Sequence, residues 1–146
     1  MQVANPWKSY RQIATQTAPP GQLVLMIFEG TLRFLDRALT GFEIEDPAES
    51  NMVVHNNVQR AQDIIRELNS SLNLEQGGEF AEKMRSLYDY FDRRLWESDL
   101  KKDRQGIDEV IRHVTKLRDA WSSMLAGQSG PGEGLQAPHH GQLVAA

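Results

Sequence analysis

The chain has 146 residues, enough for one domain with a real core, and a net charge of −4, which argues against a nucleic-acid-binding protein because such domains usually carry a basic surplus. The lack of cysteine excludes disulfides, a thiolate nucleophile and a Cys-based zinc site. No apolar run is long enough for a membrane span, and the N-terminus lacks the apolar region of a secretory signal, so we expect a cytoplasmic protein without membrane insertion.

An N-terminal arm precedes the first predicted helix. Residues 1–18 are polar and weakly periodic, but they carry two large amphipathic side chains, Trp7 and Tyr10. These aromatics are three positions apart, so one turn of helix would place them on one face. We expect this arm to be mobile or to form a short helix, and its two aromatic side chains need a docking place.

The first predicted helix spans about residues 20–39 and begins within Pro19-Pro20-Gly21, since a proline in the first turn is compatible with a helix start. Its apolar side chains fall on two adjoining lines that together cover an arc of roughly 200°. Such an arc is about twice the stripe that covers one core face, so this helix needs covering on two sides. The lines contain Leu23, Ile27, Phe34 and Ala38, and Val24, Phe28, Leu32, Leu35 and Leu39.

The second predicted helix has a clear N-terminal signature. Asp46 can cap it, Pro47 suits its first position, and Glu49 completes a pattern that resembles a capping box. Its apolar residues recur at spacings of three and four, which is typical of a bundle seam. They are Val54, Val58, Ala61, Ile65, Leu68 and Leu72. Gly77-Gly78 is predicted to end this run and to let the chain reverse.

Two more amphipathic helices are predicted, at about residues 79–99 and 103–125. The stripe of the third helix is Phe80, Met84, Leu87, Tyr88, Phe91 and Leu95, and that of the fourth is Ile107, Val110, Val114, Leu117, Trp121 and Met124. Four amphipathic helices with short connections predict an all-α fold, an antiparallel four-helix bundle. The chain therefore divides into an arm at 1–18, a bundle domain at 19–125 and a Gly/Pro-rich tail at 126–146 that we expect to be disordered.

Patterns that would indicate an enzyme are weak or missing. None of the histidines has the Glu-x-x-His spacing of a di-metal bundle site, and Glu109 with His113 is interpreted as a surface pair. Asp89 and Asp92 are predicted to project opposite the core stripe, as a solvated face. The sequence contains no phosphate-binding, dinucleotide-binding or nucleophile-elbow motif. We therefore predict no catalytic residue, no metal, no cofactor and no enzymatic activity.

The stretch LYDYFDRRL at 87–95 concentrates aromatic and charged residues on the third helix. The residues Leu87, Tyr88, Phe91 and Leu95 follow the helical stripe and are interpreted mainly as core. Tyr90 and Arg94 lie at the edge of that stripe, and Trp96 lies on the far side. Aromatic residues and arginine are enriched at protein interfaces, so Tyr90 and Arg94 are candidates for contact with another chain.

Several ordered blocks resemble the FliS family of flagellin-specific export chaperones. They are QLVLMIFEGTLRFLDRA at 22–38, NNVQRAQDIIRELNSSLN at 56–73, GGE at 77–79, LYDYFDRRLWESDLKKD at 87–103 and IDEVIRHVTKLRDAW at 107–121. The resemblance spans roughly residues 5–121 and implies a helical bundle. It also implies a cytoplasmic protein that binds the C-terminal segment of flagellin, prevents premature polymerisation and delivers flagellin to the flagellar type III export apparatus.

The resemblance and the excess of apolar surface together suggest partners and contact residues. The candidate client-binding residues are Leu25, Phe28, Ile65, Leu68, Leu72, Tyr90 and Arg94. The expected partners are the flagellin C-terminal segment and the flagellar export platform, and the free protein is expected to be a monomer or a weak dimer. An alternative is a non-enzymatic regulator or scaffold that binds another amphipathic segment.

Three roles remain open for the N-terminal arm. Trp7 and Tyr10 could cover the first helix permanently and only stabilise the fold. They could join the client interface. They could also form a gate that occupies part of the client surface and moves when flagellin binds, an interpretation favoured by the resemblance of Asn5-Pro6-Trp7…Tyr10 to the start of the family's chains.

Overall fold

The computed structural model describes residues 20–128, which form four helices. They are α2 at Pro20–Gly41, α3 at Pro47–Ser70, α4 at Leu74–Lys101 and α5 at Gln105–Gln128. The predicted arm, with Trp7 and Tyr10, lies outside the described residues, as does residue 129 onward of the predicted tail at 126–146. Residues 126–128, assigned to that tail, instead continue α5.

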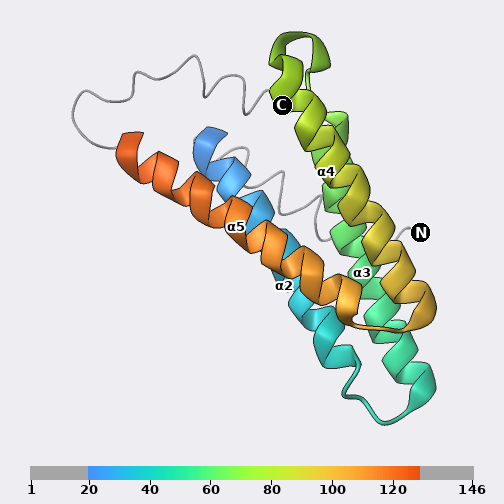
Figure 1. Cartoon of the computed structure of the whole chain (residues 1–146). Helices are drawn as coiled ribbons and strands as arrows, with labels where there is room; N and C mark the ends of the chain where they lie inside the picture. Colours follow the sequence, from blue (N-terminus) through green and yellow to red (C-terminus); the bar gives the residue numbers. More distant parts are fainter. Residues whose placement is uncertain (1–19, 129–146) are drawn as a thin grey trace, which may run out of the picture.

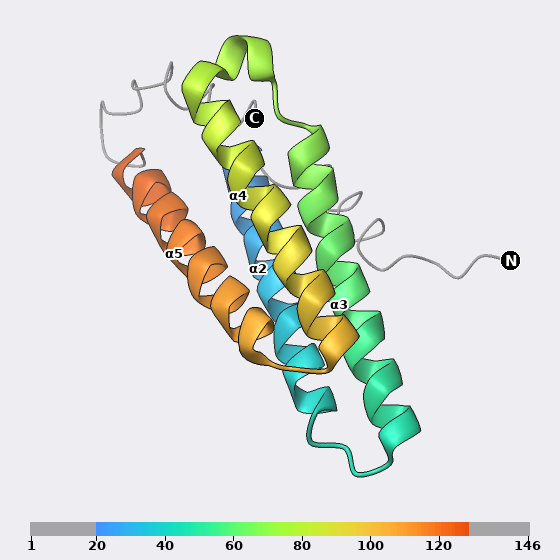
Figure 2. The same cartoon turned by 45° about the vertical axis from the view of Figure 1, so that its right-hand side comes forward.

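The helices form an antiparallel bundle in which neighbours along the chain pack side by side (Figures 1 and 2). Helix α2 packs on α3 and on α5, and α4 packs on the same two helices. Each helix therefore has its neighbours along the chain beside it in the bundle, and α5 completes the bundle by packing on α2. The predicted all-α, four-helix fold is confirmed.

The core occupies the space among the four helices. Its fully buried members include Leu35 of α2, Ile65 of α3, Phe91 and Leu95 of α4, and Ile107 of α5. A second, smaller cluster lies between α2 and α3 and is built on Ile27 and Ile64, with Leu23, Phe34 and Leu68 packed against it. The broad apolar arc of α2 is thus shared between two clusters.

Helix α3 begins as its sequence predicts but ends earlier. The Asp46 side chain accepts a hydrogen bond from the Glu49 amide at 2.8 Å, and Pro47 is the first helical residue. The helix ends at Ser70, and the chain reverses through residues 71–73, not at Gly77-Gly78. Asn73 then caps a single turn of helix by accepting from the Gln76 amide at 2.9 Å.

Gly78 lies within α4 and breaks it. Its φ of 56° and ψ of −137° are not helical, and side chains disfavour this backbone region, so glycine is required where the first turn joins the rest of α4. The prediction that Gly77-Gly78 ends the second helix was therefore wrong, because the chain has already reversed before it reaches this pair. The pair redirects the start of the following helix.

Two other predictions for α4 need correction. Phe80, assigned to the core stripe, is 38% exposed. Asp92, expected on a solvated face, is half-buried and accepts hydrogen bonds from Gln62 at 2.8 Å and Arg66 at 3.0 Å, whereas Asp89 is exposed as expected and accepts a hydrogen bond from Asn69 of α3 at 2.8 Å. These polar contacts join the edge of α4 to α3 beside the apolar core.

Candidate binding surface

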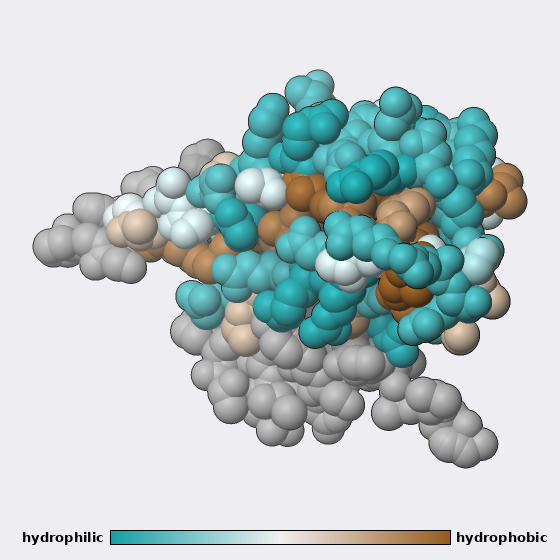
Figure 3. All heavy atoms as spheres, turned by 90° about the horizontal axis from the view of Figure 1, so that it is seen from below, coloured by the Kyte–Doolittle hydropathy of each residue, from teal (hydrophilic) through white to brown (hydrophobic). Residues whose placement is uncertain are grey.

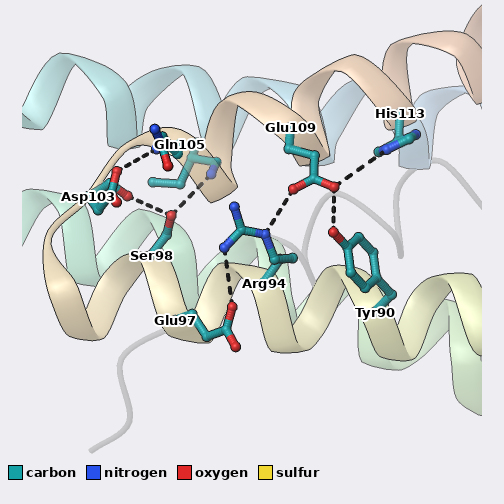
Figure 4. Close-up of polar contacts among 9 residues, drawn as sticks. Tyr90, Arg94, Glu97, Ser98, Asp103, Gln105, Glu109 and His113 are labelled. Atoms are coloured by element: carbon teal, nitrogen blue, oxygen red, sulfur yellow. Dashed lines mark hydrogen bonds and ion pairs between the residues drawn. The ribbon is translucent and has the colours of Figure 1, made fainter.

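At the connection between α4 and α5, which is the lower end of this helix pair in Figure 1, small residues let the two helices lie close together. Ser98, which is buried, donates a hydrogen bond to the carbonyl of Asp103 at 2.6 Å and accepts one from the Ile107 amide at 3.2 Å. A Cβ atom on Gly106 would lie 2.6 Å from Ser98 Oγ and 2.8 Å from the carbonyl oxygen of Arg94. The close approach of the helices therefore depends on glycine at position 106, with Ser98 as a pin across the turn (Figure 4).

One carboxylate bridges the two helices a turn further along. Glu109 of α5 accepts hydrogen bonds from the Tyr90 hydroxyl and from Arg94 Nε, the latter at 2.8 Å, and both donors come from α4 (Figure 4). Arg94 also donates to Glu97 at 3.2 Å, and His113 Nε2 lies 3.8 Å from the Glu109 carboxylate. We call the Tyr90–Arg94–Glu109 group the carboxylate bridge.

The carboxylate bridge shifts the pKa values of its members in opposite directions. The hydrogen bond from Tyr90, followed by that from Arg94, lowers the pKa of Glu109 below its ordinary value. The same hydrogen bond raises the pKa of the Tyr90 hydroxyl, since it favours the protonated phenol beside a carboxylate. The bridge is therefore most stable with Glu109 ionised and Tyr90 neutral. The sequence interpretation of Glu109 as a surface partner of His113 missed its main contacts.

Above the carboxylate bridge the two helices diverge. Figures 1 and 2 show α4 and α5 meeting at the lower connection and separating toward the other end of the bundle. The upper end of α5 is tied to α2 instead, because Trp121 Nε1 donates to the carbonyl of Gly21 at 2.8 Å. Helix α5 thus moves away from α4 toward this end of the bundle but stays in contact with α2.

Apolar side chains remain partly exposed along this divergence. On α4 they are Phe80, Met84 and Leu87, and on α5 they are Leu117 and Met124. We call these five residues the divergent seam. They continue the same apolar stripes whose lower members, such as Phe91 and Val110, are buried. Met84, Leu87 and Leu117 pack against the core from one side and stay partly exposed on the other, and a partly exposed apolar surface of this kind can bind an apolar face supplied by another chain.

Other exposed apolar residues are scattered more widely. Met52 is 56% exposed, Trp96 56% and Leu100 65%. Seen from below, the molecule carries a broken band of hydrophobic atoms between hydrophilic side chains (Figure 3). Single exposed apolar residues are normal on protein surfaces. The divergent seam differs because its members come from the facing sides of two helices.

Neither a metal-binding group nor a membrane-spanning helix is found in the described residues. Among residues 20–128 no group of three or more His, Cys, Asp or Glu side chains could hold a metal ion. No helix in the same part of the chain is long and apolar enough to cross a membrane.

The structure distributes the candidate client-binding residues over different places. Phe28, Ile65 and Leu72 are buried in the main core. Leu25 and Leu68 are half-buried, and Leu68 packs against the cluster between α2 and α3. Tyr90 also packs against the main core, and together with Arg94 it belongs to the carboxylate bridge.

The accessible positions of the divergent seam were not among the sequence-derived candidates. Leu117 and Met124 have the same helical spacing as buried residues of α5, so periodicity assigned them to the core. Where two helices separate depends on their packing further down, and a periodic stripe carries no information about that separation. The only sequence feature that distinguishes this part of the stripe is the charged residues beside it.

Comparisons with known proteins agree on one family. A family model described as "Flagellar protein FliS" matches residues 3–128. The flagellar secretion chaperone FliS of Bacillus subtilis (strain 168) is 37% identical over 128 residues, covering 88% of this chain and 92% of the relative. The corresponding protein of Salmonella typhimurium (strain LT2) is 33% identical over 129 residues, covering 85% and 93%. That of Escherichia coli (strain K12) is 31% identical over 134 residues, covering 88% and 96%.

Proposed function

The chain belongs to the FliS family of flagellar secretion chaperones, and from this membership we propose that it binds the C-terminal segment of flagellin in the cytoplasm. In this role it keeps the bound segment from polymerising early and delivers flagellin to the flagellar type III export apparatus. The activity is non-enzymatic and needs no cofactor, because holding a segment requires only contact surface.

The observation that carries the proposal is the divergent seam. Leu87 on α4 and Leu117 on α5 remain half-buried on facing sides of the bundle, although their helices are packed tightly lower down. A client with an amphipathic segment can bury its apolar face there rather than in another copy of itself. Burial of apolar surface supplies the affinity, while ordering of the client segment opposes it, so binding stays reversible.

The sequence-derived contact residues fall into two groups, one partly accessible and one buried. Leu25, Leu68, Tyr90 and Arg94 are partly accessible and can contact a client without rearrangement of the core. The buried residues Phe28, Ile65 and Leu72 would meet a client only if the helices around them opened. We therefore rank the partly accessible residues and the divergent seam first.

The N-terminal arm belongs to the proposal as a gate. We propose that Trp7 and Tyr10 cover part of the client surface in the empty protein and leave it when flagellin binds. Such competition lowers the apparent affinity for the client. Deletion of residues 1–16 should then tighten or speed client binding with the bundle intact. Weaker binding with unchanged stability would instead place the arm in the client interface, and a lower melting temperature would make it a structural cover.

Titration calorimetry with a flagellin C-terminal peptide tests the function. We expect a one-to-one complex with a negative heat-capacity change, the mark of apolar burial. Met124→Asp, in the divergent seam, should weaken binding, while Leu100→Asp, at an exposed position near the closed end, should not. Circular dichroism of both variants checks that the bundle is folded. Absence of binding at micromolar concentrations would contradict the proposal and would favour a regulator or scaffold of another segment.

A further inference from the structure

Two lysines occupy matching positions on the two sides of the divergent seam. The carboxylate bridge fixes the register of the antiparallel helices, with Tyr90 of α4 opposite Glu109 of α5. Lys83 lies seven residues before Tyr90, and Lys116 lies seven residues after Glu109. Seven residues are about two helical turns, so each lysine is on the face that its helix turns toward the other.

The lysines put like charges where the carboxylate bridge has opposite ones. Lys83 and Lys116 are both exposed, and within residues 20–128 neither is joined to an acidic side chain by a hydrogen bond or ion pair. Arg112, one turn before Lys116, adds a further exposed cation to α5. Two unpaired like charges facing each other do not draw the helices together, in agreement with the divergence above the bridge.

Acidic groups nearby offset only part of this charge. Glu109 is committed to Tyr90 and Arg94, and Asp119 accepts hydrogen bonds from Arg118 at 3.0 and 3.1 Å. On α4, the exposed side chains of Glu79, one turn before Lys83, and of Glu82, directly before it, offset the charge of Lys83. On α5, Arg112 and Lys116 keep an excess of positive charge, so the rim of the divergent seam is cationic on its α5 side in a protein whose net charge is −4.

We propose that the divergent seam binds an acidic amphipathic helix. Its apolar stripe packs on Leu87, Leu117 and Met124, and carboxylates beside that stripe pair with Lys83 and Lys116. The inference rests on the proposed function, since the helix is then a segment of the exported client. Glu109 is the internal precedent: it is one carboxylate held by donors of α4, two turns below the place that the partner's carboxylate takes.

Designed helical peptides test the charge preference directly. Two synthetic peptides share one leucine stripe, and the positions beside it carry glutamate in one and lysine in the other. The glutamate peptide should bind at least about fivefold tighter at low salt, since two partly exposed ion pairs contribute on that scale. The difference should shrink as salt is added.

Paired variants separate local charge from total charge. Lys83→Gln with Lys116→Gln should remove the preference for the glutamate peptide. Lys101→Gln with Arg104→Gln removes the same number of exposed cations at the closed end and should leave the preference unchanged. Melting temperatures should be similar for both double variants, because none of the four side chains is buried.

The remaining outcomes decide between the inference and the function on which it rests. Equal affinity for the two peptides, binding of neither, or a preference that survives in the Lys83/Lys116 variant would overturn the acidic-helix proposal. If the flagellin peptide binds equally well to that variant and to the unmodified protein, the function stands and the charge proposal fails. If the acidic peptide binds at the lysines while the flagellin peptide does not bind, the client assignment fails instead.

Discussion

The lower and upper halves of the α4–α5 seam are built by the same two helices, yet the apolar side chains of the lower half are buried, while those of the upper half pack against the core and stay partly exposed. In the lower half, Gly106 lets the backbones approach, Ser98 pins the connecting turn, and Glu109 accepts two hydrogen bonds from α4. In the upper half, Leu87 and Leu117 continue the apolar stripes, but lysines stand at the matching polar positions. The comparison indicates that apolar periodicity brings helices into a bundle, while small and polar residues decide where a pair closes.

The largest expected effect contrasts one leucine from each half. Leu95 is fully buried, so Leu95→Ala should lower the free energy of unfolding by about 2–5 kcal/mol through lost burial and a cavity. Leu87, two turns earlier on the same helix, is only partly buried, and Leu87→Ala should cost about 1 kcal/mol. Urea unfolding measures both. Equal losses would mean that the upper half is as closed as the lower.

A glycine substitution tests the close approach at the lower end. The Cβ of Gly106→Ala would lie 2.8 Å from a backbone oxygen of α4, so α5 must shift, and we expect a loss of about 1–3 kcal/mol. Gly127, near the other end of α5, has no atom within 4 Å of such a Cβ. Gly127→Ala should therefore be neutral, or stabilising by about 0.5 kcal/mol. A harmless Gly106→Ala would show that close packing does not hold the junction.

The tie between α5 and α2 can be loosened by replacing the indole of Trp121 with a smaller aromatic ring that has no N–H donor. Trp121→Phe removes the hydrogen bond to the Gly21 carbonyl and should cost about 1 kcal/mol. Hydrogen exchange should become faster at the upper end of α5, while amides near the buried Val110 stay protected. Trp96→Phe, at an exposed position, is the matched control. Unchanged exchange at the upper end would show that the hydrogen bond does not restrain it.

The smallest effect concerns the charge of the carboxylate bridge. Because the folded-state pKa of Glu109 is lowered, its contribution to stability is present above the unfolded pKa and is lost as pH falls through the folded value. The stability difference between the unmodified protein and Glu109→Gln should thus narrow between about pH 7 and pH 3. Urea unfolding across this range measures it. A stability difference that stays constant over this range would contradict the assignment.

Much of the bundle could be predicted from the sequence because its determinants are local. The Asp46–Glu49 cap and the stripe that contains Phe91 and Leu95 depend on spacing along one helix, and the structure confirms them. The position of Gly78 in the next helix could not be derived, because a glycine pair permits several backbone turns without selecting one. The carboxylate bridge was equally hidden, since its residues come from two helices whose register is set by packing.

Gly78 also has a consequence for mutational tolerance. Its side is open, with no atom within 4 Å of an added Cβ, so every side chain would fit in space. Its φ of 56° nevertheless penalises every L-residue, by roughly 1 kcal/mol or more. In a saturation mutagenesis experiment this exposed position should therefore behave like a buried one. Substitution profiles at Gly78 would report backbone conformation alone, without the steric component that dominates at crowded sites.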